Sequence, residues 1–252
     1  MSHDLTDLVV LITGSGRGLG RGAALHLATC GAVVGVVDIN GPSAQETASE
    51  IRATGGRAFA YEADLAGEKA FREVAAEFAS AAGGRIDAVV NNASVLRYEP
   101  FEEVTEENVD LMIGAGLKST IWGCQALIRH MDPARGGSIV NYASPVAVRG
   151  YARAAIYSAI KAAAAGLTRS LAAEFGPRGV RVNAMAPGSV PTPATAGLVD
   201  ETEYARRRAT IPLRRLGEEN DNNTALAFLL SKDAAFITGT ILHVDGGISG
   251  TQ

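Results

Sequence analysis

The stretch Val9–Gly20, VVLITGSGRGLG, decides the fold of this chain. It begins as a short apolar run and ends in a turn with glycines at positions 14, 18 and 20, and a helical pattern starts near Arg21. A buried strand that leads through a glycine-rich turn into a helix is typical of a βαβ unit. Glycine lets the turn bend tightly and approach a bound group closely, while the N–H groups at the helix start face an anion.

The same alternation continues along the rest of the sequence. Short runs rich in valine and isoleucine alternate with amphipathic segments of helical length, which predicts a parallel sheet with helices on both faces, the α/β class. The expected strands are Leu8–Ile12, Val33–Val37, Ala58–Tyr61, Ala88–Val90, Ser138–Tyr142, Val180–Met185 and Ile241–Val244. The expected helices include Gly18–Cys30, Ser43–Ala53, Lys69–Ala82 and one long helix from Thr105 to about Met131.

The 252 residues, of which 47% are apolar, suit one α/β domain over residues 1–252. No composition break or internal repeat marks a second domain. The least regular region, about 191–212, contains three prolines and a basic patch. It follows a strand's carboxyl end, where open α/β sheets bind ligands, so we expect a flexible substrate loop there.

Charge and composition narrow the function classes. A net charge of −4 favours neither nucleic acid nor an anionic membrane as a partner. No uninterrupted apolar run reaches the roughly 18 residues that span a bilayer, and the first ten residues lack the pattern of a secretory signal. The two cysteines lie in apolar helical patterns, which fits buried thiols in a cytoplasmic protein. The four histidines show no metal spacing, so we expect no metal site.

Asp38 strengthens the interpretation of the glycine-rich turn. By itself the spacing TGxxxGxG also fits an ordinary βα turn that binds nothing. Asp38, however, closes the second strand 18 residues after Gly20, where a carboxylate can bind the ribose hydroxyls of a dinucleotide and repel a 2′-phosphate. NAD is therefore favoured over NADP. Arg17 argues weakly for NADP, although a solvated loop arginine is the more probable interpretation.

A second group of residues suggests proton transfer. Tyr157 and Lys161 lie four residues apart in an alanine-rich helical segment and so share one face, and Ser144 precedes Tyr157 by thirteen residues at the end of an expected strand. Pro145 biases Ser144 towards an extended backbone. Oxidation of an alcohol needs a base for the hydroxyl proton, and a nearby ammonium lowers the pKa of a tyrosine towards that task. A serine hydroxyl can hold the substrate oxygen.

With these motifs the chain resembles the short-chain dehydrogenase/reductase family over essentially its whole length. The resemblance rests on TGSGRGLG, the pair Asp64–Leu65, NNAS at Asn91–Ser94, Ser144, YSAIK at Tyr157–Lys161, APG at Ala186–Gly188 and VDGG at Val244–Gly247. It implies a Rossmann-like, doubly wound, seven-stranded parallel sheet with helices on both faces, and a homotetramer.

The resemblance also implies roles for individual residues. Ser144 orients the substrate oxygen, Tyr157 is the general acid/base, and Lys161 lowers the pKa of Tyr157 and binds the nicotinamide ribose. The implied cofactor-binding residues are Gly14, Arg17, Gly18, Leu19, Gly20, Asp38, Asp64, Leu65, Asn91, Ala93, Tyr157, Lys161, Pro187, Gly188, Val190 and Thr192.

Gly116 departs from the family pattern, which has an asparagine at this position as part of a proton relay. Gly116 and Gly114 each cost the expected helix about 1 kcal/mol of stability relative to alanine. Three explanations stay open: an extra water and the Gly116 carbonyl sustain the relay, the relay is damaged, or the glycines permit close approach of helices. If Gly116 has only lost the relay asparagine, Gly116→Asn leaves kcat unchanged or raises it. If the glycine is required for close packing or for an extra water, the asparagine clashes.

The sequence thus predicts an NAD(H)-dependent oxidoreductase that interconverts a secondary alcohol and a ketone. The alternative is a catalytically weak dinucleotide-binding homologue with a regulatory or assembly role, supported only by Gly116. The run Arg206–Arg208 could attract an acidic substrate group, although a solvated helix face is the more probable interpretation. The substrate is a small alcohol or ketone of unspecified identity.

Overall fold

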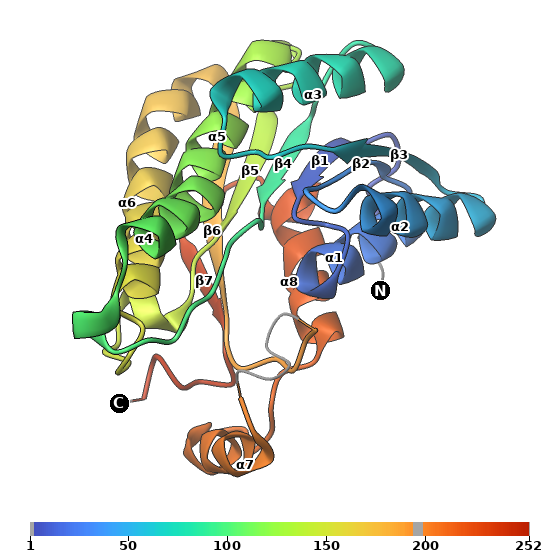
Figure 1. Ribbon diagram of the computed structural model, residues 1–252. Coiled ribbons are helices and arrows are strands. Elements are labelled where there is room, and N and C mark those ends of the chain that lie inside the picture. Colours follow the sequence, from blue (N-terminus) through green and yellow to red (C-terminus); the bar gives the residue numbers. More distant parts are fainter. Residues whose placement is uncertain (1–2, 194–198, 252) are drawn as a thin grey trace.

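The computed structural model describes residues 3–193 and 199–251, and its centre is a parallel sheet (Figure 1). The seven strands run in the order β3-β2-β1-β4-β5-β6-β7, and every neighbouring pair is parallel. This is the Rossmann-like arrangement that the sequence predicts. The strands are β1 (Val9–Thr13), β2 (Val33–Asp38), β3 (Arg57–Glu62), β4 (Ala88–Asn91), β5 (Gly137–Tyr142), β6 (Val180–Pro187) and β7 (Ile241–Val244).

Helices cover both faces of the sheet (Figure 1). Helices α1, α2 and α8 lie on one face and α3, α5 and α6 on the other, while α7 lies beyond the ends of the strands. Their bounds are α1 (Gly18–Thr29), α2 (Gly41–Ala53), α3 (Glu68–Ala81), α4 (Glu106–Ile113), α5 (Ser119–His130), α6 (Ala155–Phe175), α7 (Glu201–Thr210) and α8 (Glu219–Leu230). Single-turn 3₁₀ helices span Phe101–Glu103, Pro145–Ala147, Gly176–Arg178 and Lys232–Ala234.

Strand β1 shows why its sequence is continuously apolar. Side chains alternate between the two faces of a strand, and both faces are covered here. Val10 and Ile12 belong to the core beneath α1, α2 and α8, while Val9 and Leu11 belong to the core beneath α3, α5 and α6. All five residues of the strand are buried.

Two expected elements differ from the structure. The expected helix from Thr105 to Met131 is interrupted by a π-helical turn, Gly114–Lys118, which joins α4 to α5. Within the expected loop 191–212, the residues Glu201–Thr210 form helix α7, which Asp200 caps by accepting a hydrogen bond from Glu203 N. Residues 194–198 of that expected loop lie outside the described residues.

The segment Glu106–His130 also qualifies, by length and a mean hydropathy of 1.2, as a helix able to cross a membrane. Half of the 18-residue stretch of this segment that meets the criterion is buried inside the protein. A partly buried helix of a compact α/β fold passes the same test, so this segment carries no membrane assignment.

The order of the strands creates a crevice at one edge of the sheet. The chain proceeds outwards from β1 through β2 to β3, and then returns to the other side of β1 to form β4. The connections after β1 and β4 therefore diverge at the carboxyl edge, which is where open α/β sheets bind ligands.

Candidate active site

The glycine-rich turn forms one wall of this crevice. Gly14 has a φ of +62° and Gly18 a φ of +55°, conformations that side chains other than glycine rarely adopt. Helix α1 starts at Gly18, and its N-cap residue, Arg17, provides no side-chain hydrogen bond to the first turn. The N–H groups of that turn are thus available to an anion in the crevice.

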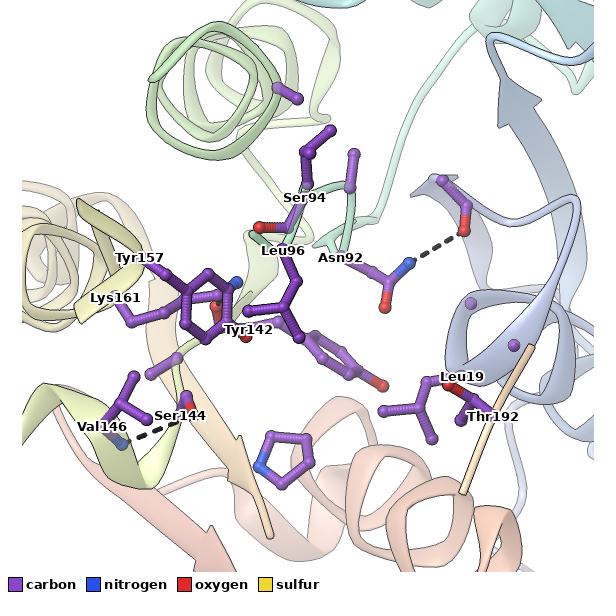
Figure 2. Close-up of a pocket in the computed structure, with 18 of the residues that line it drawn as sticks. Leu19, Asn92, Ser94, Leu96, Tyr142, Ser144, Val146, Tyr157, Lys161 and Thr192 are labelled. Atoms are coloured by element: carbon purple, nitrogen blue, oxygen red, sulfur yellow. Dashed lines mark hydrogen bonds between the residues drawn. The ribbon is translucent and has the colours of Figure 1, made fainter. Parts of the chain in front are cut away.

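Asn92 joins the turn to strand β4. Its Nδ2 donates to the carbonyl oxygens of Thr13 at 3.0 Å and Gly14 at 2.9 Å, the second of which is drawn in Figure 2. In return, Thr13 Oγ1 accepts from the backbone N–H groups of Asn92 and Ala93, each at 3.0 Å. These four bonds fix the two sides of the crevice relative to each other. The pair Thr13–Asn92 was not predicted, although Asn92 stands in the NNAS motif.

Asp38 is held at the end of β2 by two backbone groups. Its Oδ2 accepts from Gly16 N at 2.9 Å and its Oδ1 from Asn40 N at 3.0 Å. A carboxylate fixed in this way presents its charge beside the glycine-rich turn. Arg17, which lines the same crevice, is exposed.

The crevice opens into a cavity of about 560 Å³ that brings nearly all of the predicted site residues together. Asp64 and Leu65, which are expected on the adenine side, follow β3, and the residues expected at the nicotinamide end follow β6. The predicted residues that line the cavity are Gly14, Arg17, Gly18, Leu19, Gly20, Asp38, Asp64, Leu65, Ala93, Ser144, Tyr157, Lys161, Pro187, Gly188, Val190 and Thr192.

Asn91 is the exception, and its expected position in the cleft is corrected. Its side chain is buried behind the cavity, where Nδ2 donates to Asn141 Oδ1 at 2.8 Å. Asn141 in turn donates to Thr168 Oγ1 at 2.9 Å. Asn91 therefore links strands β4 and β5 to helix α6, and its neighbour Asn92 faces the cleft.

Ser144, Tyr157 and Lys161 converge on one side of the cavity, opposite Leu19 and Thr192 (Figure 2). Ser144 follows β5 with an extended backbone, as Pro145 predicts, and its Oγ accepts from Val146 N at 3.4 Å. Tyr157 and Lys161 come from adjacent turns of α6. Lys161 Nζ donates to the carbonyl oxygen of Tyr142 at 2.8 Å and lies 5.5 Å from the centre of the Tyr157 ring.

Burial shifts the pKa values of both groups. It raises the pKa of the Tyr157 phenol well above its ordinary value, the nearby Tyr98 raises it further, and a hydrogen bond with Ser144 lowers it. Burial also lowers the pKa of Lys161 to about 8. In this cavity without a dinucleotide, the neutral phenol is therefore strongly favoured, and a cation close to the phenol is what would favour phenolate.

The lining side chains outside the predicted set include Tyr98, Tyr142 and Arg207. Tyr142 has a fully buried hydroxyl that finds no hydrogen-bond partner within residues 3–193 and 199–251. Tyr98 follows β4, and Arg207 lies on α7. The basic run 206–208 was the only signal in the sequence that pointed to Arg207. The sequence does not distinguish the three arginines of that run, and only the position of α7 shows that Arg207 lines the cavity.

The residues present fit a nicotinamide dinucleotide. The evidence in the fold is the uncapped first turn of α1, the close approach of backbone at Gly14, and the anchored carboxylate of Asp38. A side chain at Gly14 would begin 2.9 Å from Ala93 Cα, so the wall of the crevice is closed to larger residues there.

Comparisons with known proteins agree with this arrangement. The sequence profile described as "Enoyl-(Acyl carrier protein) reductase" matches residues 14–249. Cyclohexanol dehydrogenase of Acinetobacter sp. (strain SE19) is 37% identical over 247 residues, which are 98% of this chain and 96% of that protein.

Two solved structures share the fold closely. The 3-ketoacyl-(acyl-carrier-protein) reductase of Brucella melitensis, complexed with NADH, has a TM-score of 0.91, 34% identity and coverage of 97% of this chain and 99% of its own. A candidate NAD(P)-dependent gluconate 5-dehydrogenase of Beutenbergia cavernae, with NADP at low occupancy, has a TM-score of 0.91, 36% identity and coverage of 97% and 98%. The chain belongs to the short-chain dehydrogenase/reductase family.

Proposed function

We propose that this protein is an NAD(H)-dependent oxidoreductase that interconverts a secondary alcohol and a ketone, with Tyr157 as the general acid/base. Membership of the family supports oxidoreductase chemistry with a nicotinamide dinucleotide in general terms. The observation that carries the finer proposal is the convergence of Ser144, Tyr157 and Lys161 in the cavity that Asp38 and the glycine-rich turn also line. We expect the protein to act in the cytoplasm.

The chain's own residues supply binding and proton transfer. The Ser144 hydroxyl hydrogen-bonds with the Tyr157 phenol, and its contact with Val146 N is long, at 3.4 Å. It can therefore turn towards a substrate oxygen that lies beside the phenol. Tyr157 donates its phenolic proton to a ketone oxygen, or accepts the proton of an alcohol in the reverse direction. A nicotinamide dinucleotide held by the glycine-rich turn, Asp38 and Lys161 would supply or accept the hydride at the carbon of that group.

Lys161 has two tasks in this proposal. Its position at 5.5 Å from the Tyr157 ring allows its positive charge to stabilise the phenolate that forms when the proton leaves. Its single hydrogen bond to the Tyr142 carbonyl leaves two N–H donors for the hydroxyls of a ribose. A buried lysine with a pKa near 8 can also exchange a proton near neutral pH.

Tyr157→Phe tests the assignment. In a screen of secondary alcohols and ketones that follows the absorbance of reduced nicotinamide, we expect kcat to fall about 10²–10⁴-fold on any substrate that the wild type accepts. The matched control is Tyr61→Phe, on β3 and outside the cavity, which should keep its activity. A Tyr157→Phe protein with most of its kcat would remove the phenol from the mechanism.

Calorimetric titration with both cofactors completes the test. Because most of a dinucleotide contacts other residues, Tyr157→Phe should bind NADH nearly as well as wild type. We expect NADH to bind more tightly than NADPH in both proteins, since a 2′-phosphate would approach the anchored carboxylate of Asp38. Equal affinities, or tighter NADPH, would mean that Arg17 outweighs Asp38.

A further inference from the structure

Helix α7 carries two adjacent arginines that share one carboxylate. Arg206 binds Glu203 through Nε at 2.6 Å and Nη2 at 2.7 Å, and Arg207 binds the same Glu203 through Nε at 2.8 Å. These hydrogen bonds lower the pKa of Glu203 to about 2, so the cluster has two positive charges and one negative charge at neutral pH. One positive charge is left uncompensated within it.

The two arginines differ in where they point. The side chain of Arg206 is 63% exposed, whereas that of Arg207 is 14% exposed and lines the cavity. Arg207 Nη1 lies 3.4 Å from Ser189 Oγ, and the phenol of Tyr98 lies against the same guanidinium. Glu203, Ser189 and Tyr98 therefore hold the guanidinium in one orientation, and its remaining N–H donors have no partner among the described residues.

Tyr98 places this guanidinium near the reacting group. The same phenol that lies against Arg207 also acts electrostatically on Tyr157, so it lies near both, and all three side chains line the same cavity. The wall around them is mainly apolar and aromatic, with Leu96, Val146, Ile211 and Ile248. A largely shielded guanidinium in such a wall binds an anion more strongly than one in water does.

We propose that Arg207 binds a carboxylate of the substrate, so that the preferred substrates are hydroxy acids and oxo acids with a short chain between the carboxylate and the reacting carbon. This deepens the proposed function and rests on it. The planar guanidinium can donate two parallel hydrogen bonds to a carboxylate, which fixes the substrate's direction as well as its affinity. Ser144 and Tyr157 then receive the oxygen at the other end.

Arg206 provides a matched control for this proposal. Arg206→Gln and Arg207→Gln each remove one positive charge from α7 and one partner of Glu203, but only Arg207 lines the cavity. The wild type and both variants are saturated with NADH and titrated calorimetrically with a series of short oxo acids and with their methyl esters. Turnover of the same compounds is then measured.

We expect the wild type to bind its best oxo acid at least about 30-fold more tightly than the ester, the effect of one hydrogen-bonded charge pair. Arg207→Gln should remove this preference, mainly through KM, while Arg206→Gln keeps it. Arg207→Lys should restore part of it, because lysine keeps the charge without the planar fork.

Two results would overturn the proposal: equal binding of acids and esters by the wild type, or an equal loss in both glutamine variants. Neither depends on turnover. Preferential binding of the acids without any turnover would contradict the proposed oxidoreductase function and leave the carboxylate site supported. Turnover of neutral ketones with no preference for acids would support the proposed oxidoreductase function and contradict the carboxylate site.

Discussion

Lys161 is a charged side chain with only 4% of its surface exposed. Its ammonium makes one hydrogen bond, to the Tyr142 carbonyl, so much of the hydration that it has in water is lost on folding. This cost favours the neutral amine and accounts for the pKa near 8. The residue that the proposed mechanism needs as a cation is thus held close to the point where it loses its charge.

A pH dependence of stability follows from that shift. Between about pH 8 and pH 10 the folded protein has lost the Lys161 proton while the unfolded chain, with a pKa near 10.5, still holds it. The unfolded state then binds more protons, so the contribution of Lys161 to the free energy of unfolding rises with pH in this window. In melting experiments without cofactor, the melting temperature of wild type minus that of Lys161→Met should increase from pH 8 to pH 10.

Subtracting the melting temperature of Lys161→Met from that of wild type cancels the effects of titrating groups that the two proteins share. Burial raises the pKa of Cys124 to about 12, which lowers stability as pH rises above about 9, but it does so in both proteins. A difference that stays flat across the window would show that the Lys161 pKa is unshifted in the folded state.

Local spacing explains which site residues could be predicted. Tyr157 and Lys161 share one helix, and Ser144 sits at a strand end whose position the apolar pattern gives, so a short motif fixes their geometry. Tyr98 comes from the loop after β4 and Arg207 from α7. Because they are far apart in the sequence, no local motif predicts that they lie close together. Asn91 and Asn92 show a further limit, because adjacent side chains on a strand point in opposite directions and the motif alone does not say which one faces the cleft.

At the scale of elements, the joint between α4 and α5 explains why glycines stand in the middle of a long helix. The π-helical turn Gly114–Lys118 widens the helix beside the cavity, and Gly114 lines the cavity directly. A Cβ on Gly116 would lie 2.8 Å from Ile160 Cγ2 of α6 and 3.4 Å from Ser94 Oγ. Of the three explanations that the sequence leaves open for Gly116, close helix approach is the one that this geometry supports.

The expectation that Gly116→Asn preserves or raises kcat therefore changes. The new side chain needs Ile160 to move, and overpacking of this kind costs about 1–3 kcal/mol of stability. We expect a lower melting temperature and a kcat no higher than that of wild type. The control is Gly166→Ala on α6, where a Cβ meets nothing within 4 Å, and helix propensity alone should add about 1 kcal/mol.

A second variant separates packing from folding failure. Ile160→Ala removes the methyl group in the way, so Gly116→Asn should cost less in that background than in wild type. A Gly116→Asn protein that is both faster and more stable than wild type would restore the view of Gly116 as the tolerated loss of an asparagine.

At the scale of the whole molecule, the sheet follows the sequence closely. All seven expected strands form within three residues of their expected bounds, since a strand covered on both faces leaves a continuous apolar run. What lies over the cavity could not be foreseen in the same way. Helix α7 is polar and none of its described residues is buried, so its sequence lacks the apolar stripe that predicts a helix. Its capping aspartate, Asp200, and its salt bridges support the helix instead.

The outer surface also bears on assembly. The helical segment Glu106–His130 is apolar enough to resemble a membrane span, yet only half of it is buried within one chain, and it lies beside α6 on the outside of one face (Figure 1). Phe101 is 69% exposed close to the start of this segment. We propose that copies of this chain cover these surfaces in a homotetramer.

Light scattering coupled to gel filtration tests this assembly. At micromolar concentration we expect four times the mass of one chain, because exposed apolar side chains such as Phe101 leave water when a symmetric partner covers them. A mass equal to one chain under those conditions would exclude the tetramer. A mass of two chains would show that the protein forms a dimer and that the proposed tetramer is wrong.

The bonds that Gly16 and Asn40 give to Asp38 have a bearing on how such a protein could change its cofactor over evolution. Replacing Asp38 with a small neutral residue would admit a 2′-phosphate, but it would also leave two backbone N–H groups without their acceptors. The segment between β1 and α1 would keep its two bonds between Ser15 and Val37 of β2 but would lose the one from Gly16. A descendant lineage that came to use NADP would therefore alter the support of this loop whenever it altered the charge, and changes in the two would be expected to occur together.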